Sequence, residues 1–151
     1  MGWSVRLAKN LIGIINRMVI VDGNNVMGQR VGWHRDKAAA QQKLINEVGR
    51  MARLRDEQHI LVFDVKSAST VTNQSSRSSI TVRYAKRGSS ADELILELVY
   101  RHIPHSAVLV VTSDRALTRQ VHVLGAKVMR SGVFRKMLEE QFQTLRPRKD
   151  F

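Results

Sequence analysis

The chain has 151 residues, 43% hydrophobic and 25% charged, which is enough apolar material for one domain with its own core and argues against disorder. No apolar run approaches the ~20 residues of a membrane helix, and the absence of cysteine excludes disulfides, cysteine zinc sites and a thiol nucleophile. The 25 Lys and Arg outnumber the 13 Asp and Glu, and the charge of +12 predicts a polyanionic partner: nucleic acid first, an anionic membrane surface second.

The predicted elements begin after an N-terminal extension. Residues 1–16 hold two cations and a short apolar stretch, without the cleavage site of a secretory signal. The continuous apolar run MVIV (18–21) predicts a strand buried on both faces, followed by a turn at DGNN (22–25). A helix is predicted after Asp36, where apolar residues recur as one buried stripe. They are Leu44, Ile45, Val48, Met51 and Ala52.

The rest of the chain alternates strands with helices. Apolar runs predict strands at 59–64, 80–85, 107–114 and 126–130, and the polar alternation at 80–85 is typical of a sheet edge. Six Ser and two Thr predict a loop at 66–79. Helices are predicted after a Ser89 or Ser90 cap, between Asp114 and Gly125, and near the C-terminus. Their inward residues are Leu94, Ile95, Leu98 and Val99; Leu117, Val121 and Leu124; and Phe134, Met137, Leu138, Phe142 and Leu145.

This order predicts an α/β fold with a mainly parallel five-stranded sheet flanked by helices. One domain is expected over 17–146, followed by a basic tail at 147–151. In such sheets ligands bind outside the carboxyl ends of the strands. The residues at those strand ends are therefore the first candidates for function.

Acidic residues gather at these strand ends. Asp22, Asp64 and Asp114 follow three of the predicted strands, and Asp92 with Glu93 opens the helix after another. Adjacent strands lie about 4.8 Å apart, so the carboxylates can converge and then repel one another unless a cation lies between them. Hard cations such as Mg2+ or Mn2+ take such oxygen ligands. The simpler alternative is that Asp92 and Asp114 are only helix caps and that Asp22 and Asp64 only end strands.

An acidic cleft on a strongly basic chain predicts metal-dependent hydrolysis of a phosphodiester. Lys86, Arg87, Arg115 and Arg119 lie on or just beyond the flanking loops, and we expect them to contact a nucleic-acid backbone; the alternative is a solvated, merely solubilising face. The sequence has no HExxH, GxGxxG, GxxxxGK[ST] or GxSxG motif and no aromatic RNP motif. Zinc protease, dinucleotide-binding, P-loop and serine hydrolase chemistries are therefore disfavoured.

Five segments carry a recognisable pattern: VIVDGNNVMG, GWHRDKAAA, LVFD, RYAKRGSSADELILELV and VVTSDRALTRQVHVLGAKVMRSGVF. In order and spacing, from Met18 to Leu138, they resemble the YacP-like branch of the NYN domain family of PIN-like nucleases. The resemblance implies a PIN-like sheet, dependence on Mg2+ or Mn2+, and hydrolysis of RNA. It implies that Asp22, Asp92 and Asp114 are the catalytic, metal-binding acids, with Asn25 and Asp64 supporting the cleft. Glu93 stands where many relatives have a second Asp, and it is a further candidate metal ligand.

We therefore expect a cytoplasmic, metal-dependent endoribonuclease, in which the DGNN amides and the Asn24 or Asn25 side chains position the scissile phosphate. Internal cleavage is expected because nothing in the sequence indicates a pocket for an RNA end. The main alternative is a catalytically weak or inactive RNA- or ribosome-associated protein with the same fold. A third hypothesis is a phosphohydrolase that acts on small substrates, but a charge of +12 is more than a small phosphate requires.

Overall fold

The computed structural model describes residues 17–64 and 80–144. The predicted N-terminal extension, the Ser-rich segment at 66–79 and the basic tail lie outside the described residues. No helix in the described ranges combines the length and apolar character needed to cross a membrane.

Five strands form one sheet in the order β3-β2-β1-β4-β5, and every neighbouring pair is parallel. The strands are β1 (Arg17–Asp22), β2 (Gln58–Phe63), β3 (Ile80–Tyr84), β4 (Ala107–Val111) and β5 (Lys127–Met129). The predicted α/β fold is confirmed, with a described sheet that is parallel throughout rather than mainly so. The chain builds β2 and β3 on one side of β1 and then β4 and β5 on the other, so the strand order reverses between β1 and β4.

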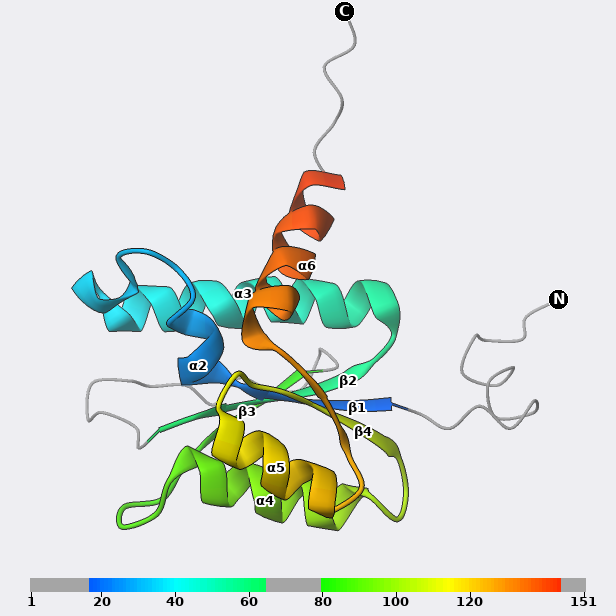
Figure 1. Cartoon of the computed structure of the whole chain (residues 1–151). Helices are drawn as coiled ribbons and strands as arrows, with labels where there is room; N and C mark the ends of the chain where they lie inside the picture. Colours follow the sequence, from blue (N-terminus) through cyan, green and yellow to red (C-terminus); the bar gives the residue numbers. More distant parts are fainter. Residues whose placement is uncertain (1–16, 65–79, 145–151) are drawn as a thin grey trace, which may run out of the picture.

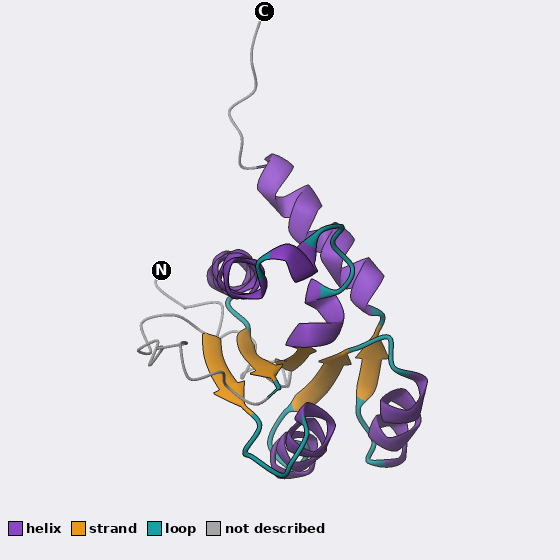
Figure 2. Ribbon diagram, turned by 90° about the vertical axis from the view of Figure 1, so that its left-hand side faces the viewer, coloured by secondary structure: helices purple, strands orange, loops and turns teal. Residues whose placement is uncertain are grey.

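Helices cover both faces of this sheet. They are α2 (Gly23–Met27), α3 (Lys37–Arg55), α4 (Ala91–His102), α5 (Arg115–Val123) and α6 (Ser131–Thr144), with a short 3-10 helix, η1 (Trp33–Arg35). Figure 1 shows α2, α3 and α6 on one face and α4 and α5 on the other. Figure 2, seen from the side, shows the strands as a layer between them. The arrangement is a three-layer α/β/α sandwich.

Burial on both faces explains the apolar runs of the central strands. Ile20 and Val21 of β1 are fully buried although they point to opposite faces, and the same holds for Leu61 and Val62 of β2. The burial of β3 alternates, because β3 lies at the edge of the sheet, as its sequence predicts.

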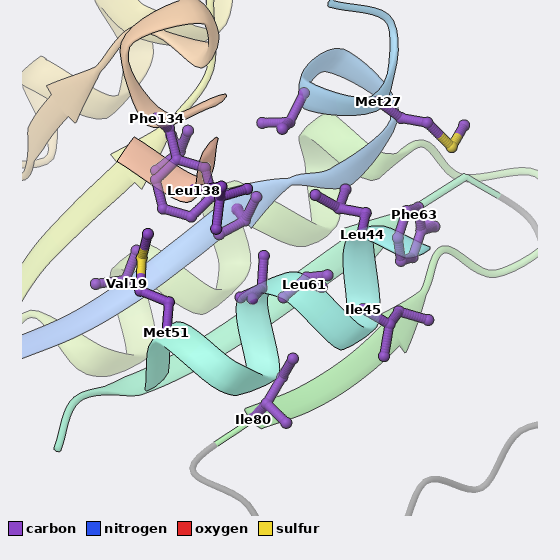
Figure 3. Packing of buried hydrophobic residues seen from close by; sticks show 14 of the residues in the cluster. Val19, Met27, Leu44, Ile45, Met51, Leu61, Phe63, Ile80, Phe134 and Leu138 are labelled. Carbon is purple, nitrogen blue, oxygen red and sulfur yellow. The ribbon is translucent and has the colours of Figure 1, made fainter. Parts of the chain in front are cut away.

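The larger core packs between the sheet and α3 and α6. All five residues of the stripe predicted on α3 are buried. Figure 3 shows Leu44, Ile45 and Met51 of this stripe facing Leu61 of the sheet, with Phe134 and Leu138 of α6 beside them. Two members of the stripe predicted on α6, Phe142 and Leu145, lie outside the described side chains.

The structure corrects two local expectations and decides between two alternatives for the cap of α4. The DGNN segment is not a simple turn, because its residues from Gly23 onward begin α2. The fourth strand ends at Val111 rather than at residue 114, since the backbone leaves the sheet there to cap α5. Ser90, not Ser89, is the cap of α4, and its hydroxyl accepts a hydrogen bond from the Glu93 amide at 3.1 Å.

Candidate active site

The point where the strand order reverses holds a buried carboxylate. Asp22 is the last residue of β1 and is only 6% exposed. Its Oδ2 accepts a hydrogen bond of 2.9 Å from the Thr112 hydroxyl, which lies just beyond the end of the neighbouring β4. Parallel sheets bind ligands at such a reversal of strand order, in the crevice between the two central strands. The Thr112 hydroxyl thus holds Oδ2, and the Asn25 backbone amide also bonds to this carboxylate, so Asp22 is fixed in place at the crevice.

The next residue fits this crevice because it has no side chain. A Cβ at Gly23 would lie 2.4 Å from a ring carbon of Phe63. Phe63 is itself buried and stacks on Tyr84 with ring centroids 5.9 Å apart, so it has little freedom to move aside. Glycine therefore lets the chain turn from β1 into α2 directly over the sheet.

The acids at this edge influence one another. Burial raises the pKa of Asp22 to about 6; the hydrogen bond from Thr112 opposes this rise, and the negative charges of Asp92 and Asp64 add to it. Burial also raises the pKa of Asp92, and the charges of Asp114 and Asp64 raise it further. The structure thus places Asp22, Asp64, Asp92 and Asp114 close enough for their charges to interact, and we call these four residues the acidic edge.

The neighbours Asp92 and Glu93 have different surroundings. Both lie in the first turn of α4, but Asp92 is half-buried and faces the charges of the other acids. Glu93 is exposed, and its Oε2 accepts a 2.7 Å hydrogen bond from the Ser89 hydroxyl. The structure therefore groups Asp92, rather than Glu93, with the acidic edge.

Asp114 caps α5. Its Oδ1 accepts a hydrogen bond of 2.9 Å from the Leu117 amide, and its own amide donates to the Thr112 hydroxyl at 3.1 Å. The capping role considered for Asp114 from sequence is thus present. It uses one carboxylate oxygen and leaves Oδ2 for a second task.

The two asparagines of α2 accept hydrogen bonds from the segments that follow the neighbouring strands. The Asn24 Oδ1 accepts a hydrogen bond of 2.8 Å from the Asp64 amide, after β2. The Asn25 Oδ1 accepts bonds from the Ser113 amide, at 2.9 Å, and from the Ser131 hydroxyl, at 2.5 Å. Both side-chain oxygens are therefore committed to the protein, and only their NH2 groups can donate to a phosphate.

Sequence reasoning missed the hydroxyl network of Thr112, Ser113 and Ser131. Ser113 Oγ accepts a hydrogen bond of 3.0 Å from the Ser131 amide, so the network joins the end of β4 to the start of α6. The usable signal was the TSD tripeptide after a buried strand, because Ser and Thr at such a position bond to nearby backbone groups.

The donor chemistry of the edge fits a hard divalent cation. Among the described residues, no three His, Cys, Asp or Glu side chains already form a cluster that could hold a metal ion. Mg2+ does not require one, since it commonly binds one or two carboxylates and completes its shell with water and substrate phosphate. No cationic side chain is among the causes that shift the pKa values of Asp22 and Asp92. A bound cation would supply the missing counter-charge.

Cationic side chains flank the acids on both sides. Lys86 and Arg87 are exposed in the turn between β3 and α4. Arg115 and Arg119 are exposed on α5, beyond the end of β4. These four side chains are therefore exposed on the segments that flank the acidic edge, and their contact with RNA stays a prediction.

The sequence profile of the YacP-like NYN domain matches residues 19–150. The chain belongs to this family. The match confirms the resemblance seen in the sequence motifs, and it places the chain among PIN-like nucleases. No curated protein matches the chain.

Solved structures of this family share the fold. The chain is similar to the crystal structure of Rae1 (YacP) from Bacillus subtilis, with a TM-score of 0.68 and 19% identity, covering 84% of this chain and 78% of that one. A mutant of the same Bacillus subtilis protein gives a TM-score of 0.68 and 20% identity, covering 85% and 80%. The PIN-like α/β architecture of the NYN chain is thereby confirmed.

Proposed function

We propose that the chain is a cytoplasmic, metal-dependent endoribonuclease that hydrolyses RNA phosphodiester bonds at the acidic edge, with Mg2+ or Mn2+ as its cofactor. The observation that carries the proposal is the buried Asp22 at the reversal of strand order, which Asp92 and Asp64 repel, while Asp114 repels Asp92. A protein of +12 charge gains nothing from such a cluster unless a cation and a polyanion meet there. Membership of a nuclease family supports the same reading.

In this proposal Asp22, Asp92 and Asp114 are the metal-binding acids. The cation, when bound, lowers the pKa of water and neutralises charge on the scissile phosphate. Thr112 fixes the Asp22 carboxylate, and Asp92 orients the attacking water by accepting a hydrogen bond from it. Asp64 and Glu93 are further candidate metal ligands. They add negative charge near the cation or hold the water molecules around it.

The substrate is positioned by donors around the acids. The amides of DGNN and the NH2 groups of Asn24 and Asn25 donate to the scissile phosphate, and Lys86, Arg87, Arg115 and Arg119 contact phosphates on either side. Asp64 is exposed and basic side chains lie on both flanks, so an RNA chain can pass across the edge without a free end. This supports internal cleavage.

A cleavage assay tests the proposal. Linear and circular labelled RNA would be incubated with Mg2+, Mn2+ or EDTA and with three proteins: wild type, Asp22→Asn, and the control Asp56→Asn, an exposed acid at the end of α3. Metal-dependent opening of the circle by the wild type and the control, but not by Asp22→Asn, is the expected result. Cleavage in EDTA, or by Asp22→Asn at the wild-type rate, would overturn the proposal.

One observation favours a second candidate, an RNA- or ribosome-associated binding protein without catalysis. The exposed side chains of Lys86, Arg87, Arg115 and Arg119 can bind an RNA backbone whether or not the acids hold a metal ion. In that case the wild-type chain would bind RNA and leave the circle closed at every metal concentration.

A further inference from the structure

A groove lies beside the acidic edge, on the side of β4 away from β1. It has a volume of about 570 Å³ and runs between α5 and the segment that follows β5. Arg115, Arg119, His122 and Arg130 line it, and we call these four residues the cationic groove. His122 and Arg130 lie in the last of the five segments that carry the family resemblance, but neither has a role at the acidic edge.

The arginines of the groove are not neutralised. In the described part of the chain, Arg115, Arg119 and Arg130 are all exposed and none has an acidic partner within ion-pair distance. No Asp or Glu is among the residues that line the groove. On the opposite face of the sheet, by contrast, Arg30 and Arg135 share Glu47 at 3.1 and 3.3 Å. Three unpaired like charges around one groove favour a bound polyanion.

The spacing of these charges suits an extended strand. Arg115 and Arg119 are four residues apart on α5, which places them about 6 Å apart along the helix axis. This is close to the distance between successive phosphates of an extended single strand, and Arg130 lines the groove from the segment after β5. No Phe, Tyr or Trp side chain lines the groove, and its arginines suit contact with the sugar–phosphate backbone.

The groove is continuous with the acids. Thr112 and Ser113 line its inner end, and Thr112 is the residue that donates to the Asp22 carboxylate. Arg115 follows Asp114 directly in the chain, at the start of α5 (Figure 1). A strand lying in the groove therefore leads to the acidic edge without crossing another element.

We propose that the cationic groove binds the backbone of single-stranded RNA on one side of the scissile bond, with Arg119 and Arg130 contacting phosphates next to the one that is cleaved. The proposal rests on the proposed function, because it assigns a path to a flanking part of the same substrate. It adds Arg130 and His122 to the RNA surface and makes the preferred substrate unpaired RNA.

Binding without metal tests this assignment separately from catalysis. The affinity of the full chain for a fluorescent polyuridine oligonucleotide would be measured by anisotropy in EDTA over a series of salt concentrations. The variant is Arg119→Ala with Arg130→Ala; the control is Arg53→Ala with Arg55→Ala, which removes the same charge from the exposed end of α3. Loss of two phosphate contacts should lower the salt slope by about 1.4. Affinity should fall at least about tenfold, while the control stays within about twofold of the wild type.

Two further arms make the result decisive. Arg119→Lys with Arg130→Lys keeps the charge and should restore most of the affinity, which a merely misfolded variant would not show. A duplex of the same length should bind more weakly than the single strand. Equal loss in the groove variant and the control, or equal binding of duplex and single strand, would overturn the proposal. Failure of the wild type to cleave RNA would refute the proposed function alone, since no metal is present in the binding assay.

Discussion

Replacing Asp22 by Asn should make the metal-free protein more stable at neutral and alkaline pH. Asp22 is buried and its pKa is raised to about 6 from an ordinary value of 3.8. The folded state therefore binds this proton more tightly than the unfolded state does, and ionisation of Asp22 opposes folding. The amide of Asn has almost the same shape, keeps an acceptor for the Thr112 hydroxyl and carries no charge.

The size of the effect follows from the two pKa values. Below about pH 3.8 the Asp22 carboxyl is protonated in both the folded and the unfolded state, and its contribution to the free energy of unfolding is fully present. That contribution is lost as the pH rises through about 6, and at about pH 8 the wild type has lost about 3 kcal/mol relative to a neutral side chain. For a chain of this length the difference corresponds to a melting temperature roughly 6–12 °C higher in Asp22→Asn than in the wild type.

Thermal unfolding in EDTA, followed by circular dichroism from about pH 4 to about pH 8, measures the difference between the two proteins. The gain should be small at the acid end and should grow through about pH 6, whereas Asp56→Asn, at an exposed position, should show no such growth. Saturating Mn2+ should raise the melting temperature of the wild type and leave that of Asp22→Asn unchanged. An Asp22→Asn protein that is less stable than the wild type at about pH 8 would refute the electrostatic reasoning.

Three other predictions concern the same edge. Asp92→Asn should cost at least about tenfold more activity than Glu93→Gln in single-turnover cleavage at saturating Mn2+, a difference of about 1.4 kcal/mol, and equal losses would point to a shared role. Lys86→Ala with Arg87→Ala should flatten the salt dependence of RNA affinity by about one to two, and an unchanged slope would move the RNA path away from β3. Thr112→Val removes the hydrogen bond that lowers the pKa of Asp22, so the acid limb of the pH–rate profile should move up by about one pH unit; an unmoved limb would show that Asp22 does not titrate in catalysis.

The sequence predicts the frame of this fold well because the frame follows from local patterns. The apolar runs around Ile20 and Leu61 are typical of strands that are buried on both faces, as in a parallel sheet covered by helices. The apolar stripe predicted on α3 consists of residues that are all buried in the structure. Since all strands are parallel, the acids that follow them reach one edge whatever the order of the strands. That is why Asp22 and Asp114 can be grouped without knowing the sheet order.

The features that sequence reasoning missed depend on contacts between distant segments. DGNN resembles a turn because it is short and polar, yet it starts α2 because Asn24 and Asn25 bond to loops 40 and 88 residues away. Arg130 has no helical or strand pattern that marks it for RNA. It joins Arg119 only because the segment after β5 packs beside α5. Neither relation is visible in a window of neighbouring residues.

The hydrogen bond between Asp22 and Thr112 also has a consequence for synthesis of the chain. It joins residues 90 positions apart, because β4 adds to the sheet beside β1, the first described strand. While a ribosome has delivered only β1 to β3, one edge of β1 is unpaired and Asp22 has no partner hydroxyl. Such non-local pairing is slow and leaves a strand edge open to wrong partners. The proposed cleavage centre therefore forms only after most of the chain has been translated. Products that stop between α4 and β4 contain three of the four acids, Asp22, Asp64 and Asp92, without the Thr112 hydroxyl that holds Asp22.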